Sequence, residues 1–291
     1  VLPPRINDEG ITQSKLDELA YQYKYDDHGR CIAKKLPGCD WIYYIYDRAH
    51  QVIFTQDGEQ RLKGVWTFTI PDAMGRIVLT GTCSNNLNYL AATPIDGVVK
   101  ATWAKVTSSN KGYTLSGITL SNPLILSANY YDSYEFMGLN GIPATTDASF
   151  KYAAETGYGT WHAGDYTNGN KYKSKGLLTG TLTAQLNSNG TVSTAYLYSV
   201  MYYDYKGQLI QIKSNNHLTG GIEKEYIAYN FTGQPVKKMH VHTASGKATQ
   251  TEYYTYEYDH AGRLLKTKHK LNTGAEVLLA ENTYDELGRL I

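Results

Sequence analysis

Short runs of alternating polar and apolar positions fill most of the chain, and clusters of Gly, Asp, Asn and Ser separate these runs. Tyr254, Tyr256 and Tyr258 take every second position of one run, and Tyr113 and Leu115 do the same in another. Residues two apart lie on the same face of a strand, so each run predicts a strand with one partly buried face. The pattern predicts an all-β protein of short antiparallel strands.

Helical patterns are rare. Ile11, Leu16 and Leu19 lie partly on one side of a helix, which predicts one short helix before the chain becomes a strand near Tyr21. Residues 98–106 allow a second helix, but their β-branched content favours a strand.

A short phrase, Tyr-Asp-x-x-Gly-Arg, recurs along the chain. Complete copies begin at Tyr25, Tyr258 and Tyr284. Weaker copies begin at Tyr46, Pro71, Tyr203 and Tyr229. The last four of these seven copies follow one another at intervals of 26, 29 and 26 residues. Such a period is typical of a repeated supersecondary unit.

The phrase suits the backbone of a turn. An Asp at the first position accepts a hydrogen bond from an amide two residues on, and Gly at the fourth position adopts the left-handed conformation that other residues resist. Each copy therefore predicts a β-hairpin with a bulge after its turn. The turn residues expected from the copies are Asp26, Gly29, Arg30, Asp72, Gly75, Arg76, Asp204, Gly207, Gly233, Asp259, Gly262, Arg263, Asp285, Gly288 and Arg289.

A catalytic role for the same Asp and Arg residues is less favoured. A catalytic pair needs one special environment, whereas these residues recur at regular spacing along the chain. We expect each Asp to hold a turn and each Arg to lie across a tyrosine ring or to pair with a carboxylate.

The copies at 25–30, 258–263 and 284–289 resemble the rearrangement-hotspot (RHS), or YD-repeat, family of large bacterial secreted and surface proteins. The resemblance is strongest over residues 176–291, looser over residues 21–80 and weakest between them. It implies a strip of stacked β-hairpins that forms a partial spiral or shell, as in bacterial toxin-complex cocoons. It also implies a scaffold that encloses a toxin domain or displays an adhesive region, with secretion or cell-surface location. The chain lacks the Asp-Pro-x-Gly type sequence of the family's self-cleavage site, so no catalytic residue is carried over.

The spacing of the copies predicts three regions. Residues 1–92 and 196–291 carry YD-repeat hairpins, the second set truncated at the end, and residues 93–195 form an inserted or degenerate β region. The repeat cut short at residue 291 suggests a piece of a longer polypeptide, in which neighbouring repeats would cover an unpaired edge near Arg289.

The glycine-rich stretch 157–176 is the most unusual part of the middle region. Aromatic rings and polar groups on an exposed loop are typical of a sugar-binding surface, because rings stack on the apolar faces of sugars. The other interpretation is a long loop whose aromatic residues pack on the sheet. The candidate ligand surface consists of Tyr158, Trp161, His162, Asp165 and Tyr166.

The charge and apolar content of the chain argue against two classes of partner, nucleic acids and membranes. The formal net charge is +1, which gives no electrostatic basis for nucleic-acid binding, and no apolar run is long enough to insert into a membrane. The 27 tyrosines against 5 phenylalanines favour half-buried strands, whose rings pack while their hydroxyls reach water or a neighbour. Cys31 and Cys39 could form a bridge across a hairpin, or could act with Cys83 as small buried apolar residues.

Other chemistry is weakly indicated. His240 and His242 lie two apart and could begin a metal site, but no third ligand is evident, and we expect neither a metal nor a cofactor. No nucleophile motif, phosphate loop or calcium loop is present in the sequence. We expect a non-enzymatic structural repeat region, with a carbohydrate-binding or adhesive module as the alternative and a cryptic hydrolase as a second alternative.

Overall fold

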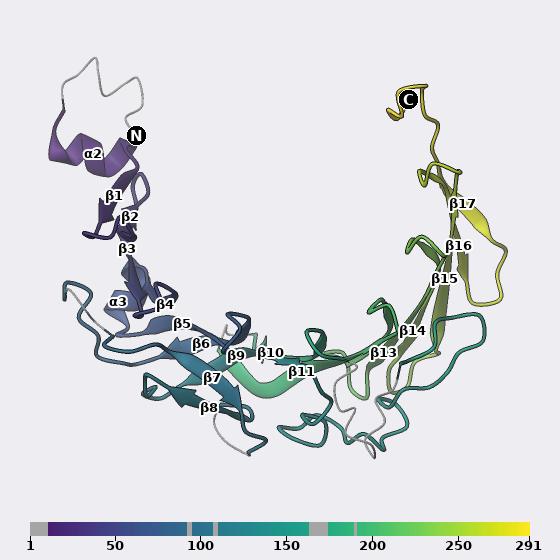
Figure 1. Cartoon of the computed structure of the whole chain (residues 1–291), viewed down its shortest axis with the longest axis horizontal. Coiled ribbons are helices and arrows are strands. Elements are labelled where there is room, and N and C mark those ends of the chain that lie inside the picture. Colours follow the sequence, from purple (N-terminus) through teal and green to yellow (C-terminus); the bar gives the residue numbers. More distant parts are fainter. Residues whose placement is uncertain (1–10, 92–94, 107–109, 163–173, 189–190) are drawn as a thin grey trace. The chain divides into compact units, whose positions relative to one another are not determined.

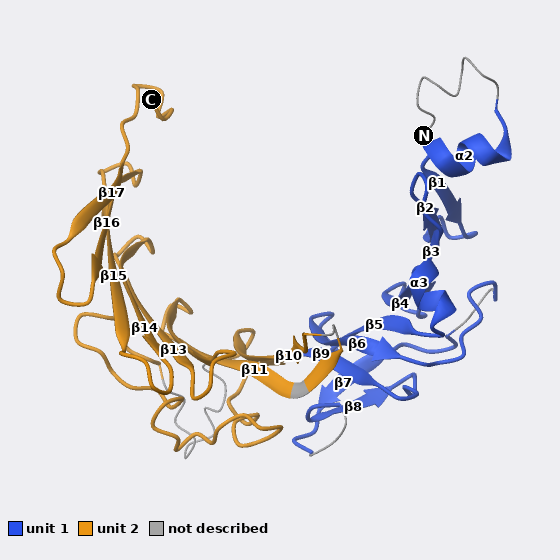
Figure 2. Cartoon of the chain, turned by 180° about the vertical axis from the view of Figure 1, so that it is seen from behind, with its two compact units in different colours: residues 1–128 blue, residues 129–291 orange. Residues whose placement is uncertain are grey.

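The computed structural model describes residues 11–91, 95–106, 110–162, 174–188 and 191–291. The chain divides into two compact units, residues 1–128 and 129–291, which Figure 2 shows in different colours. Figure 1 labels most of the helices and strands of both units. The boundary between the units falls inside the region 93–195 that the sequence sets apart from the repeats.

The first described element of the first unit is a short helix, α2. Thr12 caps this helix by accepting a hydrogen bond from the amide of Lys15. A capping box at Asp57 and Gln60 starts a second helix, α3. The elements that follow one another here are α2 (Gln13–Leu19), β1 (Gln22–Tyr25), β2 (Cys31–Lys35), β3 (Trp41–Tyr46), β4 (Val52–Gln56), α3 (Gly58–Leu62), β5 (Trp66–Pro71) and β6 (Ile77–Cys83).

Strands β1 to β6 pair with their neighbours in chain order, and every pair is antiparallel. Strands β7 (Lys100–Trp103) and β8 (Tyr113–Ser116) form a separate two-stranded sheet. Strand β9 (Leu124–Tyr131) pairs with β6 and carries the chain into the second unit. Residues 98–106 thus contain a strand, in agreement with their β-branched content.

The second unit is a ladder of antiparallel strands that also follow chain order. Its strands are β10 (Leu178–Leu186), β11 (Val192–Tyr203), β12 (Leu209–Asn215), β13 (Ile222–Tyr229), β14 (Pro235–Thr243), β15 (Gln250–Tyr258), β16 (Leu264–Leu271) and β17 (Val277–Glu281). Residues 132–162, called the covering segment below, form turns and bends without a strand or helix.

Alternation along the strands produces the cores. In β5, Trp66, Phe68 and Ile70 are buried while the threonines between them are half-buried. In the second unit, Leu182, Tyr202 and Ile210 of the ladder are buried together with Phe136 and Phe150 of the covering segment. Burial of apolar surface is the main favourable term in folding, at about 25 cal/mol for each Å². Each unit therefore has its own hydrophobic core.

The all-β prediction and the short helix near Gln13 are confirmed. The three cysteines are free thiols, and only Cys83 is buried, so neither interpretation of Cys31 and Cys39 holds in full. No helix in the described ranges is both long and apolar enough to cross a membrane.

Candidate functional site

The repeated turns form one hydrogen-bond pattern. In the first turn, Oδ1 of Asp26 accepts hydrogen bonds from the amides of His28 (3.0 Å) and Arg30 (2.9 Å), and Oδ2 accepts from Nε of Arg30 (2.6 Å). Equivalent bonds join Asp72 to Arg76, Asp259 to Arg263 and Asp285 to Arg289. Both carboxylate oxygens of each Asp are thus used inside its own turn.

The fourth turn residue has a positive φ, as the turn chemistry predicts. The φ is 74° at Gly29, 80° at Gly262 and 78° at Gly288. Gly75, Gly207 and Gly233 lie between 76° and 88°. A register shift accompanies the turns, for example between Glu257 and Tyr258, which is the expected bulge.

Tyrosine hydroxyls connect one hairpin to the preceding one. Tyr258 donates to the carbonyl of Pro235 (2.9 Å), and Tyr284 donates to the carbonyl of Leu264 (3.0 Å). Corresponding bonds are Tyr46 to Cys31, Tyr203 to Leu178 and Tyr229 to Leu209. The motif Tyr therefore acts as a strut between consecutive repeats.

The motif Arg reaches across to the next repeat as well. The guanidinium of Arg30 lies 4.8 Å from the ring centre of Tyr46, and that of Arg263 lies 4.9 Å from the ring centre of Tyr284. Hydrogen bonds from the amide and side chain of Arg263 hold the pKa of Asp259 below its ordinary value. Hydrogen bonds from Arg289 lower the pKa of Asp285 in the same way. Carboxylates held ionised in this way are poorly suited to donate a proton in catalysis.

Among the copies that depart from the motif, those at Asp47 and Asn230 show how the turn is kept. His50 takes the place of glycine after Asp47 and has a φ of 60°. Asn230 replaces Asp, and its Oδ1 accepts from the amide of Gln234 (2.9 Å). Gln234, which replaces Arg, donates from Nε2 to the carbonyl of Gly262 in the next turn. These copies keep the turn with different side chains.

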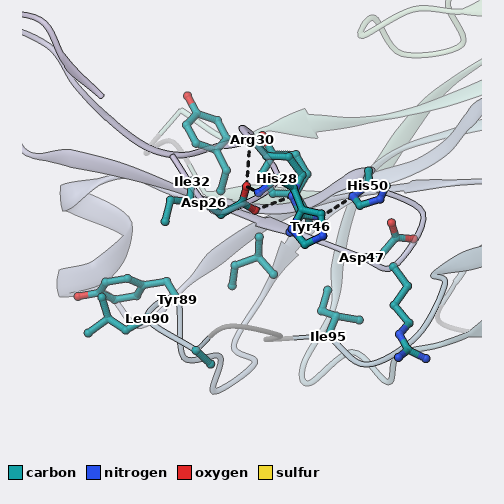
Figure 3. Close-up of a pocket in the computed structure, with 14 residues that line it drawn as sticks. Asp26, His28, Arg30, Ile32, Tyr46, Asp47, His50, Tyr89, Leu90 and Ile95 are labelled. Carbon is teal, nitrogen blue, oxygen red and sulfur yellow. Dashed lines mark hydrogen bonds and ion pairs between the residues drawn. The ribbon is translucent and has the colours of Figure 1, made fainter. Parts of the chain in front are cut away.

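A cavity of about 460 Å³ opens between two successive turns of the first unit (Figure 3). Ile32, Ile45 and Ile95 give it apolar walls, and His28, His50 and Arg48 give it a basic rim. Nη1 of Arg30 lies 2.8 Å from Nδ1 of His50. Because a guanidinium only donates, Nδ1 of His50 must accept, which places the proton of the neutral ring on Nε2.

The acidic groups of this cavity are already engaged. Oδ1 of Asp47 accepts from the amides of Ala49 and Gln51, and Oδ2 accepts from the amide of Val99. Asp26 is held by Arg30, as Figure 3 shows. Among the described residues, the lining includes no Ser, Cys or Thr nucleophile beside either histidine.

The candidate ligand surface lies partly in the covering segment. The ring of Trp161 packs within 5.5 Å of the ring centres of Tyr134, Tyr152 and Tyr202. The ring centre of Tyr158 lies 6.0 Å from that of Tyr226. His162 donates its amide to the carbonyl of Tyr203 (2.9 Å). Asp165 and Tyr166 lie outside the described residues, and ligand binding by this set stays a prediction.

Polar side chains of the ladder hold the covering segment in place. Nζ of Lys213, a residue 1% exposed, donates to the carbonyl of Lys151. Gln211 accepts from the amide of Ala153 and donates to its carbonyl. Burial lowers the pKa of Lys213 to about 8. No signal in the sequence reveals this role of Gln211 and Lys213, because both lie in an ordinary strand pattern.

His240 and His242 share one carboxylate. Nε2 of His240 lies 2.8 Å from Oε2 of Glu223, and Nδ1 of His242 lies 2.6 Å from Oε1. Burial opposes ionisation of Glu223, but hydrogen bonds from Asn216, His242 and His240 keep its pKa below the ordinary value. In the part of the chain that the structure describes, no group of three or more His, Cys, Asp or Glu residues could hold a metal ion.

No protein-family model and no curated protein matches the sequence. Among solved structures, the chain is similar to TcdB2-TccC3-TEV, with a TM-score of 0.37 and 11% identity over 100% of this chain and 13% of that chain. It is similar to TcdB2-TccC3 without its hypervariable C-terminal region, with a TM-score of 0.36 and 12% identity over 100% and 13% of the two chains. A third match, TcdB2-TccC3-Cdc42, has a TM-score of 0.24 and 13% identity over 93% and 14%.

The chain thus spans about 13% of the length of the first solved structures that it matches. TM-scores of 0.24 to 0.37 are too low to assign a function to this chain.

Proposed function

We propose that the chain is a non-enzymatic structural repeat region of a larger exported bacterial protein, in which it forms part of a scaffold or shell. The observation that carries this proposal is the equivalence of the repeats. Turns in both units use the same atoms of Asp and Arg for the same bonds, as at Asp26 and Asp259. Because the Asp and Arg side chains of the motif are engaged in hydrogen bonds within their own turn, they support a structural role rather than a catalytic one.

The connections between repeats support a continuous wall. Five motif tyrosines fix their hairpins to the preceding one through a single hydroxyl: Tyr46, Tyr203, Tyr229, Tyr258 and Tyr284. Such nearest-neighbour contacts allow hairpins to be added one after another without a new core. The exposed strand β17 and the 74% exposed side chain of Arg289 would accept a further hairpin in the same way.

The partner implied for such a shell is a segment of the same protein, either an enclosed toxin domain or a displayed adhesive region. One of the similar structures is TcdB2-TccC3 without its hypervariable C-terminal region, so that protein has such a region. For the present chain, enclosure of a variable cargo and export from the bacterium belong to the proposal.

Sequencing the gene around this chain tests the proposal directly. A shell protein should encode further Tyr-Asp-x-x-Gly-Arg copies on at least one side, at intervals near the 26 to 29 residues seen here. The encoded protein should then protect a non-repeat segment from added protease while its wall is intact. A reading frame without further copies, or a cargo segment cut as fast as an isolated peptide, would refute the shell role.

A further inference from the structure

A groove of about 330 Å³ lies between two neighbouring turns of the second unit. One wall comes from the turn at Asp204, the other comes from the turn at Asn230, and Tyr158 of the covering segment borders it. Both turns belong to copies that depart from the complete motif, which sets this groove apart from the regular repeats.

Two aromatic rings stand exposed at this groove. Phe231 is 91% exposed and Tyr205 is 73% exposed, and both occupy the second position of their turns. In the complete copies of the motif, the same position holds the polar residues Asp27, His260 and Glu286. An exposed phenylalanine gains no stability from burial, and here it stands beside an exposed tyrosine at the same groove.

Lys206 holds the two rings in one arrangement. Its Nζ donates to the carbonyl of Phe231 (3.3 Å) and lies 5.1 Å from the centre of the Phe231 ring and 5.8 Å from that of Tyr205. The rings are therefore linked across two consecutive repeats, which gives the groove a prearranged aromatic edge.

Asp204, which lines the groove, has a carboxylate oxygen that its turn leaves unused. Oδ1 of Asp204 accepts from the amides of Lys206 (2.8 Å) and Gln208 (2.9 Å), as in the complete copies. In those copies the motif Arg occupies Oδ2, but Gln208 stands in its place here. Within the described residues, Oδ2 of Asp204 has no hydrogen-bond partner.

We propose that this groove binds a neutral saccharide. A sugar ring presents an apolar C–H face that stacks on Phe231 or Tyr205, and its hydroxyls donate to the unused carboxylate oxygen of Asp204. A hydrogen bond to a charged acceptor is among the stronger ones available to a hydroxyl. Lys206 can donate to the oxygens of the same sugar.

The site differs from the ligand surface predicted from sequence, with which it shares only Tyr158. It stands independently of the shell role, because a surface groove can bind sugar on a scaffold or on an isolated module. A second hollow beyond Gly157 and Tyr158 contains Lys237 and Lys270, so an acidic sugar would have a competing place to bind.

The test uses the chain with an array of neutral and acidic oligosaccharides, followed by calorimetry with the neutral sugars that bind. Three variants probe the groove: Phe231→Ala, Asp204→Asn and Gln208→Arg. Asn holds the equivalent turn at position 230, so Asp204→Asn keeps the turn and removes the carboxylate acceptor. Gln208→Arg restores the arginine that occupies Oδ2 elsewhere. Leu287→Ala, at an exposed position of the last turn, is the matched control.

We expect a neutral saccharide to bind, each groove variant to weaken it at least about tenfold, and Leu287→Ala to leave it unchanged. Unchanged thermal melts would show that the variants fold. The proposal is overturned if no neutral saccharide binds at about 10 mM. It is equally overturned if binding survives Gln208→Arg, or if only acidic sugars bind and Asp204→Asn has no effect.

Discussion

The fourth residue of each turn carries a positive φ, and the chain meets this requirement in two ways. Glycine does so without a steric penalty at positions such as Gly29 and Gly262, whereas His50 does so with a side chain. The sequence predicts the glycines because the motif contains them. The copy beginning at Tyr46 places His50 at the same turn position, where the motif predicts glycine, and a histidine with a positive φ is less common.

Gly29 offers a clean measurement of this backbone requirement. A Cβ at Gly29 would meet no atom within 4 Å, so substitution affects only the conformation with φ of 74°. Gly29→Ala should lower the free energy of unfolding by about 1 kcal/mol. Gly29→Asn should lose less, because Asn tolerates this region. Urea denaturation followed by circular dichroism measures both, and equal losses for Ala and Asn would contradict the backbone explanation.

The turn carboxylates should make stability depend on pH in the acid range. The backbone amide and side chain of Arg263 lower the pKa of Asp259 in the folded chain below the ordinary 3.8. A lowered folded pKa contributes stability that is present above the unfolded pKa and is lost as the pH falls through the folded pKa. Unfolding by urea should therefore become easier below about pH 4.

Asp259→Asn isolates this contribution. It keeps the Oδ1 acceptor of the turn but cannot titrate, so its stability should change less between about pH 5 and the acid range than that of the parent chain. Identical pH profiles of stability for parent and variant would show that ionisation of Asp259 does not stabilise the folded chain.

At the scale of elements, the strands and hairpins are predictable from alternation and turn residues, whereas the covering segment is not. Its path depends on long-range bonds, such as Gln211 to Ala153, and on the close approach of Gly159 to Ile210. A Cβ at Gly159 would lie 2.3 Å from the side chain of Ile210, so the glycine there allows contact with the sheet. The helix α3 was missed, although its capping box at Asp57 is a signal that could have revealed it.

Lys213, which holds the covering segment, should make the stability of the chain depend on pH in the alkaline range. Burial lowers its folded pKa to about 8, below the ordinary 10.5. Between these values the unfolded chain binds more protons, so stability should rise with pH. Lys213→Met should remove the rise between about pH 8 and pH 9.5, a window below tyrosine titration. Parallel stability curves for parent and variant would contradict the buried, proton-losing lysine.

The strut between repeats is testable in one strand. Tyr258→Phe removes the hydroxyl that donates to Pro235 and should cost about 1 kcal/mol of unfolding free energy. Tyr256→Phe in the same strand is the control, because its hydroxyl has no hydrogen-bond partner among the described residues. Chemical denaturation measures the unfolding free energy of both variants. An equal or larger loss of unfolding free energy in Tyr256→Phe would contradict the role of the Tyr258 hydroxyl.

At the scale of the whole molecule, both units are built from one kind of hairpin, with the same turn at Asp26 in the first and at Asp259 in the second. This regularity is why the fold class could be predicted from the sequence. The saccharide groove could not, because the sequence shows the departures at Gln208 and Phe231 but does not show that these two turns and Tyr158 line one groove.

The most direct test of the central claim is electron cryomicroscopy of the complete polypeptide that the gene encodes. A structural shell predicts hairpins that continue in chain order beyond this chain, with motif tyrosines bonded to the preceding repeat, around an enclosed space. An isolated compact domain in this region, with a substrate bound among converging catalytic side chains, would contradict it.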